Sequence, residues 1–318
     1  MKKEIGIFTL LLVLCGVTAV LNPKFISPVN MTNMANVIGM FGIFSIGLGL
    51  VIITGGIDLS VGSMFALCGV LLAMGLTEWN WPWPVAALAA IAIPMVLGLV
   101  HGLLITRMKI QPFIITLCGL LIYRGMARFI ADDGTKGFGN AEGFEVFRDV
   151  AKGKLLGMPM PFVLLIIIAI IMWFVLHRSV YGRYLLAVGR NEEATRFSGI
   201  NTRLVIASSY VIAGLLAGIS GILFAFYTNS VSPSNHGNFY ELYGIAAAVL
   251  GGCSLRGGEG SILGIIIGTA LLQVLQNLVN LLGIPSSLNF AVMGAVVLIG
   301  VLADQYFQGR AQKKLVRH

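Results

Sequence analysis

The chain has 318 residues, of which 57% are hydrophobic and 11% charged, and its formal net charge is +8. Ordinary globular domains carry roughly 25% charged residues. The composition therefore excludes a disordered chain and a disulfide-rich secreted scaffold, argues against a soluble enzyme, and indicates a helical membrane protein. The excess of Lys and Arg needs no nucleic-acid partner, because these residues gather on the cytoplasmic side of membrane proteins.

Apolar runs of about 20 residues, the length that crosses a bilayer, recur along the chain and predict about ten transmembrane helices. In chain order they cover residues 5–21, 33–53, 59–76, 84–105, 112–131, 161–177, 204–228, 241–253, 261–282 and 287–303. The second and eighth runs reach glycine-rich breaks, and the eighth is too short to cross alone. We predict an all-α, polytopic membrane fold that forms a single domain, 1–318.

The distribution of charge predicts the orientation. With the N-terminus inside, the cytoplasmic segments hold fourteen of the twenty-one Lys and Arg residues and the outside loops hold five. The opposite orientation would violate the positive-inside rule. We therefore predict cytoplasmic N- and C-termini, an outside loop at about 132–160 and a basic cytoplasmic segment at about 178–203. The outside loop is either a docking or lid element or a plain solvated loop.

Catalytic motifs are missing from the sequence. It has no Gly-x-x-x-x-Gly-Lys phosphate loop, no His-Glu-x-x-His and no Gly-x-Ser-x-Gly. Its four histidines and four cysteines are scattered without the spacing of metal ligands. We predict that the chain is not an enzyme, binds no metal and holds no cofactor of its own.

A polar segment, TGGIDLSVGS at 54–63, lies between two apolar runs. An ionised Asp at the centre of a span costs roughly 2.5–3.5 kcal/mol on insertion scales, so Asp58 needs a partner, a cavity or a helix end. The glycines can break the helix. Asp58, Ser60 or Ser63 then either caps the next helix or lines the path of a hydroxylated solute.

A short helix is predicted in the most basic segment, where residues 189–200 read GRNEEATRFSGI. Asn191 suits an N-cap, and the acidic residues after it complement the positive end of the helix. Glu192 and Arg196 are four residues apart and can pair, and Gly199 suits the left-handed position that ends a helix. About two turns are too short to be stable alone. The helix must therefore lean on its own membrane domain or on a partner protein.

At three segments the sequence resembles the permease subunits of bacterial ABC importers for ribose, arabinose, galactose and similar monosaccharides. These segments are ITGGIDLSVGS at 53–63, GRNEEATRFSGI at 189–200 and AAAVLGGCSLRGGEGSILG at 246–264. With the span pattern, the resemblance runs from about residue 5 to residue 305. It implies the ten-helix type II permease fold, similar to the membrane subunit of the vitamin B12 importer.

The resemblance also implies the partners. They are a second permease copy, with a homodimer expected, a cytoplasmic ATP-binding subunit that holds ATP and Mg, a periplasmic sugar-binding protein, and the lipid of the bacterial inner membrane. Segment 189–200 would be the coupling helix that contacts the ATPase. The residues assigned to this contact are Gly189, Arg190, Asn191, Glu192, Glu193, Ala194, Arg196, Phe197 and Gly199.

A neutral sugar calls for hydroxyl and amide groups along its path rather than formal charges. The candidates for this path are Asn36, Ser45, Thr54, Asp58, Ser60, Gln273, Gln276, Asn277 and Asn280. The last four recur at three- and four-residue spacing and form one polar stripe on the ninth predicted span. This stripe either faces the sugar or makes hydrogen bonds between helices.

The predicted function is the membrane-spanning subunit of an ATP-driven importer that carries a ribose-like pentose or a hexose across the inner membrane by alternating access. The alternative is a secondary transporter driven by an ion gradient. Such a transporter would need several ionisable residues at mid-membrane, whereas Asp58 stands nearly alone within the apolar runs.

Overall fold

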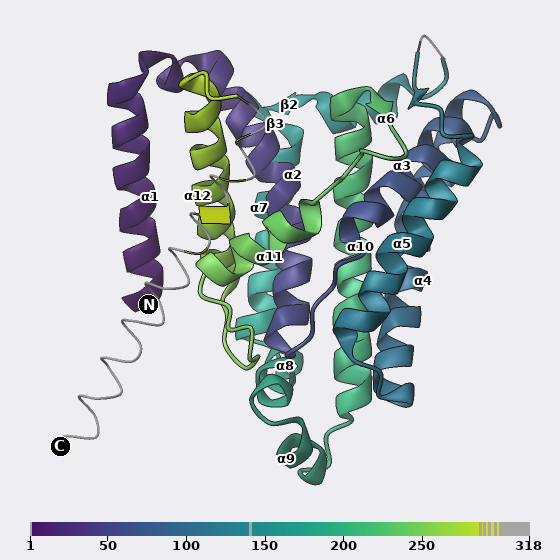
Figure 1. Cartoon of the computed structure of the whole chain (residues 1–318), viewed down its shortest axis with the longest axis vertical. Coiled ribbons are helices and arrows are strands. Elements are labelled where there is room, and N and C mark those ends of the chain that lie inside the picture. Colours follow the sequence, from purple (N-terminus) through teal and green to yellow (C-terminus); the bar gives the residue numbers. More distant parts are fainter. Residues whose placement is uncertain are drawn as a thin grey trace.

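The computed structural model describes residues 2–139 and 142–285, together with 288, 291, 294, 295 and 298, and the chain forms a helical bundle (Figure 1). Its long helices are α1 (Lys2–Leu21), α2 (Pro28–Ile53), α4 (Trp83–Met108), α5 (Pro112–Ile130), α7 (Met160–His177), α10 (Thr202–Thr228) and α12 (Ile262–Leu281). Within the described part of the chain, these seven helices are long and apolar enough to cross a membrane. The all-α, polytopic membrane class is therefore confirmed. Apart from the isolated positions, the tenth predicted span, 287–303, lies outside the described residues.

Shorter elements complete the fold. The helices are η1 (Pro23–Ile26), α3 (Val61–Thr77), α6 (Glu145–Lys152), α8 (Val180–Arg190), α9 (Glu192–Phe197) and α11 (Tyr240–Leu250). The strands are β1 (Lys136–Gly137), β2 (Lys154–Leu155), β3 (Met158–Pro159) and β4 (Ser230–Val231). Helices α8 and α9 lie at one end of the bundle, and η1 and α6 lie at the other (Figure 1). We call these the α9 end and the α6 end.

Two apolar helices, α3 with seventeen residues and α11 with eleven, are shorter than the seven long helices. Helix α2 ends at the predicted glycine break, where Gly55 has a φ of +82°, and the chain returns without helical structure to the start of α3. Helix α11 has eleven residues, so the prediction that this run is too short to cross alone is confirmed. A Cβ on Gly62 would overlap the carbonyl oxygen of Gly237. The starts of α3 and α11 therefore meet inside the bundle.

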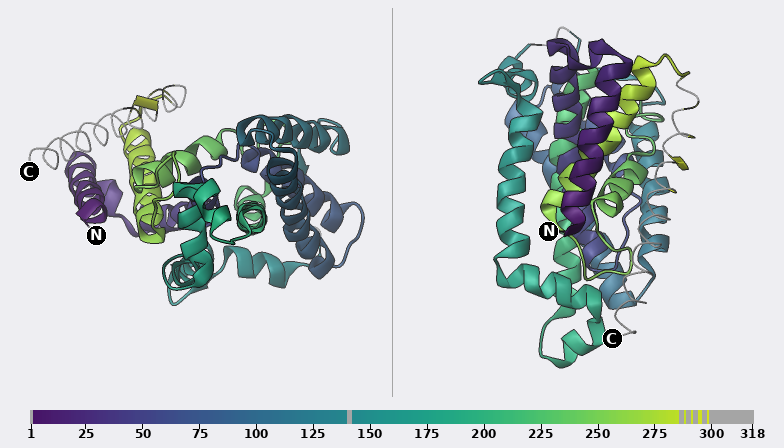
Figure 2. Two further views of the ribbon diagram at one scale, coloured as in Figure 1. Left: turned by 90° about the horizontal axis from the view of Figure 1, so that it is seen from below. Right: turned by 90° about the vertical axis from the view of Figure 1, so that its left-hand side faces the viewer.

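Helix α2 is the most buried long helix, because it packs against α7, α10, α11 and α12. Helix α1 instead lies at the rim, packed on α12, with most of its surface open (Figure 2). The glycines of α4 and α10 allow a close crossing of these two helices. A Cβ on Gly98 or on Gly214 would overlap the backbone of the facing helix. The glycines that recur at four-residue spacing, Gly98 with Gly102 and Gly214 with Gly218, thus serve packing within one chain.

The predicted outside loop is a structured cover at the α6 end. Strand β1 pairs with β4, and β2 pairs with β3 in a hairpin. The ring of Phe138 stacks on Phe226 of α10 at a centroid distance of 4.6 Å, and Phe147 approaches the same ring at 5.0 Å. Aromatic contacts therefore fix this segment to the bundle, which a plain solvated loop would not require.

Candidate functional site

Helix α9 forms where local sequence rules predict a short helix. The side-chain oxygen of Asn191 accepts a hydrogen bond from the Ala194 N–H at 2.9 Å, and Gly199 adopts a φ of +84°. The predicted pair of Glu192 with Arg196 is wrong. The Glu192 carboxylate accepts a hydrogen bond from the Thr202 hydroxyl at 3.1 Å, because it turns toward the start of α10. Arg196 instead lies 4.0 Å from the carboxylate of Glu193.

Helix α9 projects from the bundle (Figure 1) and buries little of its own surface. Thr195 is its one buried residue, whereas the Phe197 side chain is 77% exposed and lies under the Arg196 guanidinium at 5.6 Å. A large ring on a six-residue helix thus presents apolar surface, with Arg196 of the same helix over it. This arrangement suits contact with another protein, because aromatic and Arg side chains dominate binding at interfaces.

The three sequence segments that carry the family resemblance meet beside α9. The Gly258 N–H donates to the Ile53 carbonyl at 2.8 Å. A Cβ on Gly257 would lie 2.7 Å from the carbonyl oxygen of Gly189 and 2.9 Å from the amide nitrogen of Gly55. We call this meeting of Ile53, Gly55, Gly189, Gly257 and Gly258 the glycine crossing. It joins the end of α8 to the end of α2 and to the 251–260 loop by backbone contact.

The Asp58 side chain is buried and makes its hydrogen bonds within its own turn. One carboxylate oxygen accepts both the Ser60 N–H at 2.9 Å and the Ser60 hydroxyl at 2.6 Å. The Ser63 hydroxyl donates to the Ser60 carbonyl at 2.7 Å. These bonds fix the turn before α3, but no side chain of the described residues caps the first turn of the helix, so the capping role expected of Asp58, Ser60 or Ser63 is not met.

Sequence reasoning gave no role to two further ionisable groups inside the bundle, the half-buried Arg124 and the buried Glu241. The Arg124 guanidinium on α5 donates to the carbonyls of His236 at 2.7 Å, Pro233 at 3.1 Å and Gly62 at 3.3 Å. The Glu241 side chain on α11 is 6% exposed and lies beside Gly62. Arg124 therefore holds the starts of α3 and α11 together. Its signal in the sequence was an Arg in the middle of an apolar run, which marks a partner or a cavity.

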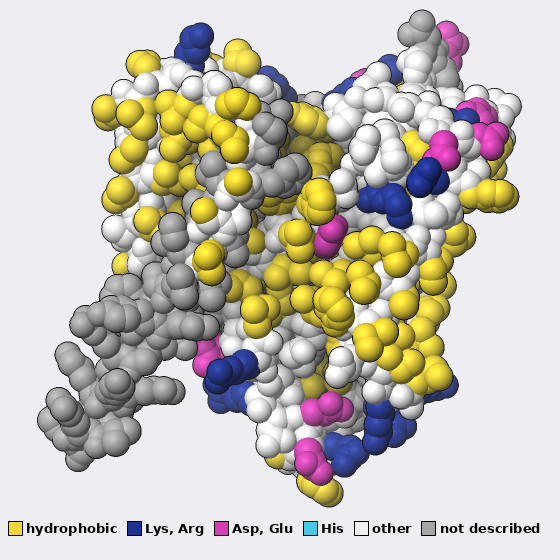
Figure 3. Space-filling view, viewed as in Figure 1, with side chains coloured by type: hydrophobic (Ala, Val, Ile, Leu, Met, Phe, Trp, Pro, Cys, Tyr) yellow, Lys and Arg dark blue, Asp and Glu magenta, His cyan; other side chains and the backbone are white. Residues whose placement is uncertain are grey.

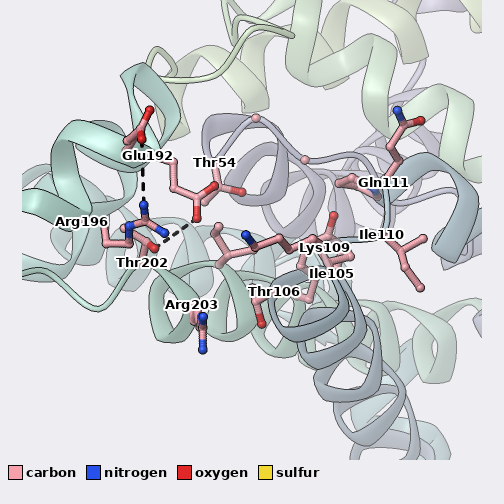
Figure 4. Close-up of a pocket in the computed structure, with 16 residues that line it drawn as sticks. Thr54, Ile105, Thr106, Lys109, Ile110, Gln111, Glu192, Arg196, Thr202 and Arg203 are labelled. Carbon is pink, nitrogen blue, oxygen red and sulfur yellow. Dashed lines mark hydrogen bonds and ion pairs between the residues drawn. The ribbon is translucent and has the colours of Figure 1, made fainter.

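A cavity of about 530 Å³ opens at the α9 end, between α9 and the α4–α5 connection (Figure 4). Thr54, the predicted path residue in this region, is part of its wall. The lining also carries both signs of charge, from Lys109, Arg196 and Arg203 and from Glu192 and Glu193. This α9-end cavity is a polar vestibule rather than a tailored site for a neutral molecule.

A second cavity, of about 460 Å³, lies between α2, α10, α11 and α12. Its residues are Asn30, Asn33, Met34, Val37, Phe41, Phe224, Tyr227, Asn238, Tyr240, Tyr243, Gln273, Gln276, Asn277 and Asn280. We call it the amide–tyrosine cavity. All four residues of the predicted stripe line it. Asn277 also exchanges two hydrogen bonds with Asn30, at 2.8 and 3.1 Å, so the stripe both faces a cavity and joins helices.

The other predicted path residues lie elsewhere. Ser45 and Ser60 are fully buried, and the Ser45 hydroxyl has no hydrogen-bond partner in the described part of the chain. Asn36 is half-buried on α2, on a face that belongs to neither cavity as described. The structure thus brings the stripe together with aromatic residues from three other helices, but it separates the stripe from Thr54, Asp58 and Ser60.

Comparison with known proteins agrees with this architecture. Residues 30–301 match the family described as the permease component of branched-chain amino acid transport systems. The chain is 38% identical to the ribose import permease protein of Bacillus subtilis strain 168, over 95% of this chain and 93% of that protein. It is 34% identical to the galactofuranose transporter permease protein of Escherichia coli K12, over 86% of this chain and 78% of that protein. It is 30% identical to the D-allose transport system permease protein of the same strain, over 94% and 91%. No solved structure matches the chain.

Proposed function

The chain belongs to this family of transport-system permease components, and we propose that it is the membrane-spanning subunit of an ATP-driven importer for a monosaccharide. The relatives named above are permeases for ribose, galactofuranose and D-allose. The substrate class is therefore a pentose or hexose, carried across the bacterial inner membrane by alternating access. ATP and Mg belong to the partner ATPase, since this sequence has no phosphate-binding loop.

The observation that carries the proposal is the projecting α9 and its attachment. A subunit without a nucleotide site cannot hydrolyse ATP itself. It therefore needs a surface that contacts the partner ATPase and is moved by it. Helix α9 offers the exposed Phe197 ring to a partner. The glycine crossing behind it passes displacement directly into α2 and the 251–260 loop, because the contacts there are between backbones.

The charge distribution supports a cytoplasmic position for the α9 end. Figure 3 shows Lys and Arg side chains at both ends of the molecule, and several lie around the α9 end. They include Arg107, Lys109, Arg178, Arg183, Arg190, Arg196, Arg203 and Arg256. The positive-inside rule then puts α9 against the cytoplasmic ATPase. The structured cover at the α6 end faces outward, where a periplasmic sugar-binding protein docks.

A second copy of the chain is part of the proposal. The segment that leads into α11 has no regular helix between β4 and Tyr240, and its residues Ser234, Asn235 and Asn238 are exposed. Irregular backbone is tolerated at membrane depth only where protein or a water-filled cavity shields it from lipid. A homodimer formed across this face shields the segment and encloses a path between the two copies.

Reconstitution tests the proposal. The chain would be placed in proteoliposomes with its ATPase and sugar-binding partners and given D-ribose, D-allose or D-galactose. Uptake is expected only with the complete set of partners and ATP, and it should stop when the ATPase is omitted. Uptake by the chain alone under a proton or sodium gradient would establish the ion-driven alternative and overturn the proposal.

A further inference from the structure

The amide–tyrosine cavity contains polar groups that the protein leaves unsatisfied. In the described part of the chain, the amide of Gln273 and the hydroxyls of Tyr240 and Tyr243 have no hydrogen-bond partner. The Gln273 side chain is only 5% exposed. Buried polar groups are almost always paired with protein, water or ligand. The two tyrosines are only half-buried, and the polar atoms of all three residues are open to the cavity, where water or a ligand can pair with them.

The cavity carries no formal charge. Among the described residues that line it, the polar ones are amides and phenols, without any Asp, Glu, Lys, Arg or His. A free amino acid would bury an ammonium and a carboxylate against these walls without counter-charges, which is costly. A sugar ring has hydroxyl groups that both donate to and accept from amides. The chemistry of the walls thus favours an uncharged polyol over the branched-chain amino acids after which the family is named.

Aromatic rings from three helices form part of the cavity wall. Phe41 and Phe224 each lie 4.8 Å from Tyr240 between ring centroids, and Phe44 and Phe65 pack at 5.2 Å just beyond. The apolar C–H face of a sugar packs well on such rings, while its hydroxyls reach the amides.

The dimensions suit one small ring. The lining residues of α2 run from Asn30 to Phe41, which is about 16 Å along a helix at ~1.5 Å per residue. The volume of about 460 Å³ falls in the range of small-molecule sites, roughly 300–1,000 Å³. The reciprocal pair of Asn30 and Asn277 holds α2 to α12 at the outer part of the cavity, and so keeps the walls at a fixed separation.

From these observations we infer that each permease subunit has its own saturable site for one uncharged monosaccharide, formed by the amide–tyrosine cavity. This inference rests on the proposed function, and it deepens that function by giving the permease a selectivity separate from that of the binding protein. Gln273 and Tyr243 contact the sugar hydroxyls, and Tyr240 with Phe41 and Phe224 receives the apolar face of the ring.

Direct binding tests the inference. The full-length permease in nanodiscs, without partners, would be titrated with radiolabelled D-ribose, D-allose, D-galactose and L-arabinose. At least one sugar is expected to bind saturably, and neither leucine nor ribose 5-phosphate should displace it. Gln273→Leu and Tyr243→Phe should weaken binding about five- to tenfold, the effect of one lost hydrogen bond. Gln111→Leu, the same change in the α9-end cavity, should leave binding unchanged.

The outcomes separate this inference from the proposed function. If none of the four sugars binds saturably, or if leucine displaces the bound sugar, the site is overturned even if the complete importer still takes up sugar. The same holds if Gln273→Leu and Gln111→Leu bind sugar equally well. Failure of uptake by the complete wild-type importer, by contrast, would count against the proposed function, whatever the isolated permease binds.

Discussion

Replacing Gly257 with Ala should break the glycine crossing. The new Cβ would lie 2.7 Å from the Gly189 carbonyl oxygen and 2.9 Å from the Gly55 amide nitrogen, both backbone atoms of other segments. Neither atom can turn aside as the end of a side chain would, so whole segments must separate. Overpacking of this kind costs about 1–3 kcal/mol. The φ of +85° at Gly257 adds about 1–2 kcal/mol of strain for any residue with a Cβ.

Gly252→Ala is the matched control for this change. Gly252 lies in the same 251–260 loop with a φ of +92°, but a Cβ there would have no neighbour within 4 Å. The Gly252→Ala variant therefore has the same kind of backbone strain, but its new Cβ does not push other segments apart. We expect Gly257→Ala to melt a few degrees below Gly252→Ala in detergent. In the assembled importer it should keep most ATP hydrolysis while uptake falls at least tenfold. Equal stability and equal uptake in the two variants would refute the role of the crossing.

Three further changes test other parts of the molecule. Phe197→Ala should weaken ATPase binding about thirtyfold, the effect of losing roughly 2 kcal/mol at an interface, and Glu193→Ala should likewise uncouple hydrolysis from uptake; coupled transport at the wild-type rate in both variants would contradict the contact. Asp58→Ala should lower the yield of folded protein more than sugar affinity, because Ser60 loses its buried acceptor, and Asp58→Asn should restore part of the yield; a stable Ala variant with weak uptake would instead place Asp58 on the path. Arg124→Gln should expose the segment before α11 to protease and lower the melting temperature, since three buried carbonyls lose a charged donor; unchanged digestion would contradict this.

Local rules predicted the elements that local interactions determine. The start of α9 follows from the Asn191 cap, and the end of α2 follows from the glycine pair at 55–56. The lengths of the apolar runs were enough to identify the membrane class, because a bilayer sets the length of a span. The partner of Glu192 was predicted wrongly, since helical spacing alone does not show that Thr202 from the next helix approaches it.

The site itself depends on contacts that the linear sequence does not contain. The polar stripe could be recognised from the three- and four-residue spacing of its members on one helix. That it lines a cavity depends on Phe41, Phe224 and Tyr240, which come from three other helices. Similarly, glycines recur in all three resemblance segments, yet only the tertiary structure shows that Gly189 and Gly257 touch. Each feature combines residues distant along the chain, and spacing within one element carries no information about such pairs.

Helix α2 contributes residues both to the amide–tyrosine cavity and to the glycine crossing. Its start contributes Asn30 to the amide–tyrosine cavity, and its last residue, Ile53, accepts a hydrogen bond in the glycine crossing. Phe41, one of the aromatic residues that line the cavity, is twelve residues from Ile53, or about 18 Å along one unbroken helix. Because α2 is one unbroken helix packed against α7, α10, α11 and α12, alternating access as proposed requires it to shift as a unit. Under the proposed function, a shift of α2 at the crossing would therefore also move Phe41, a residue of the cavity wall.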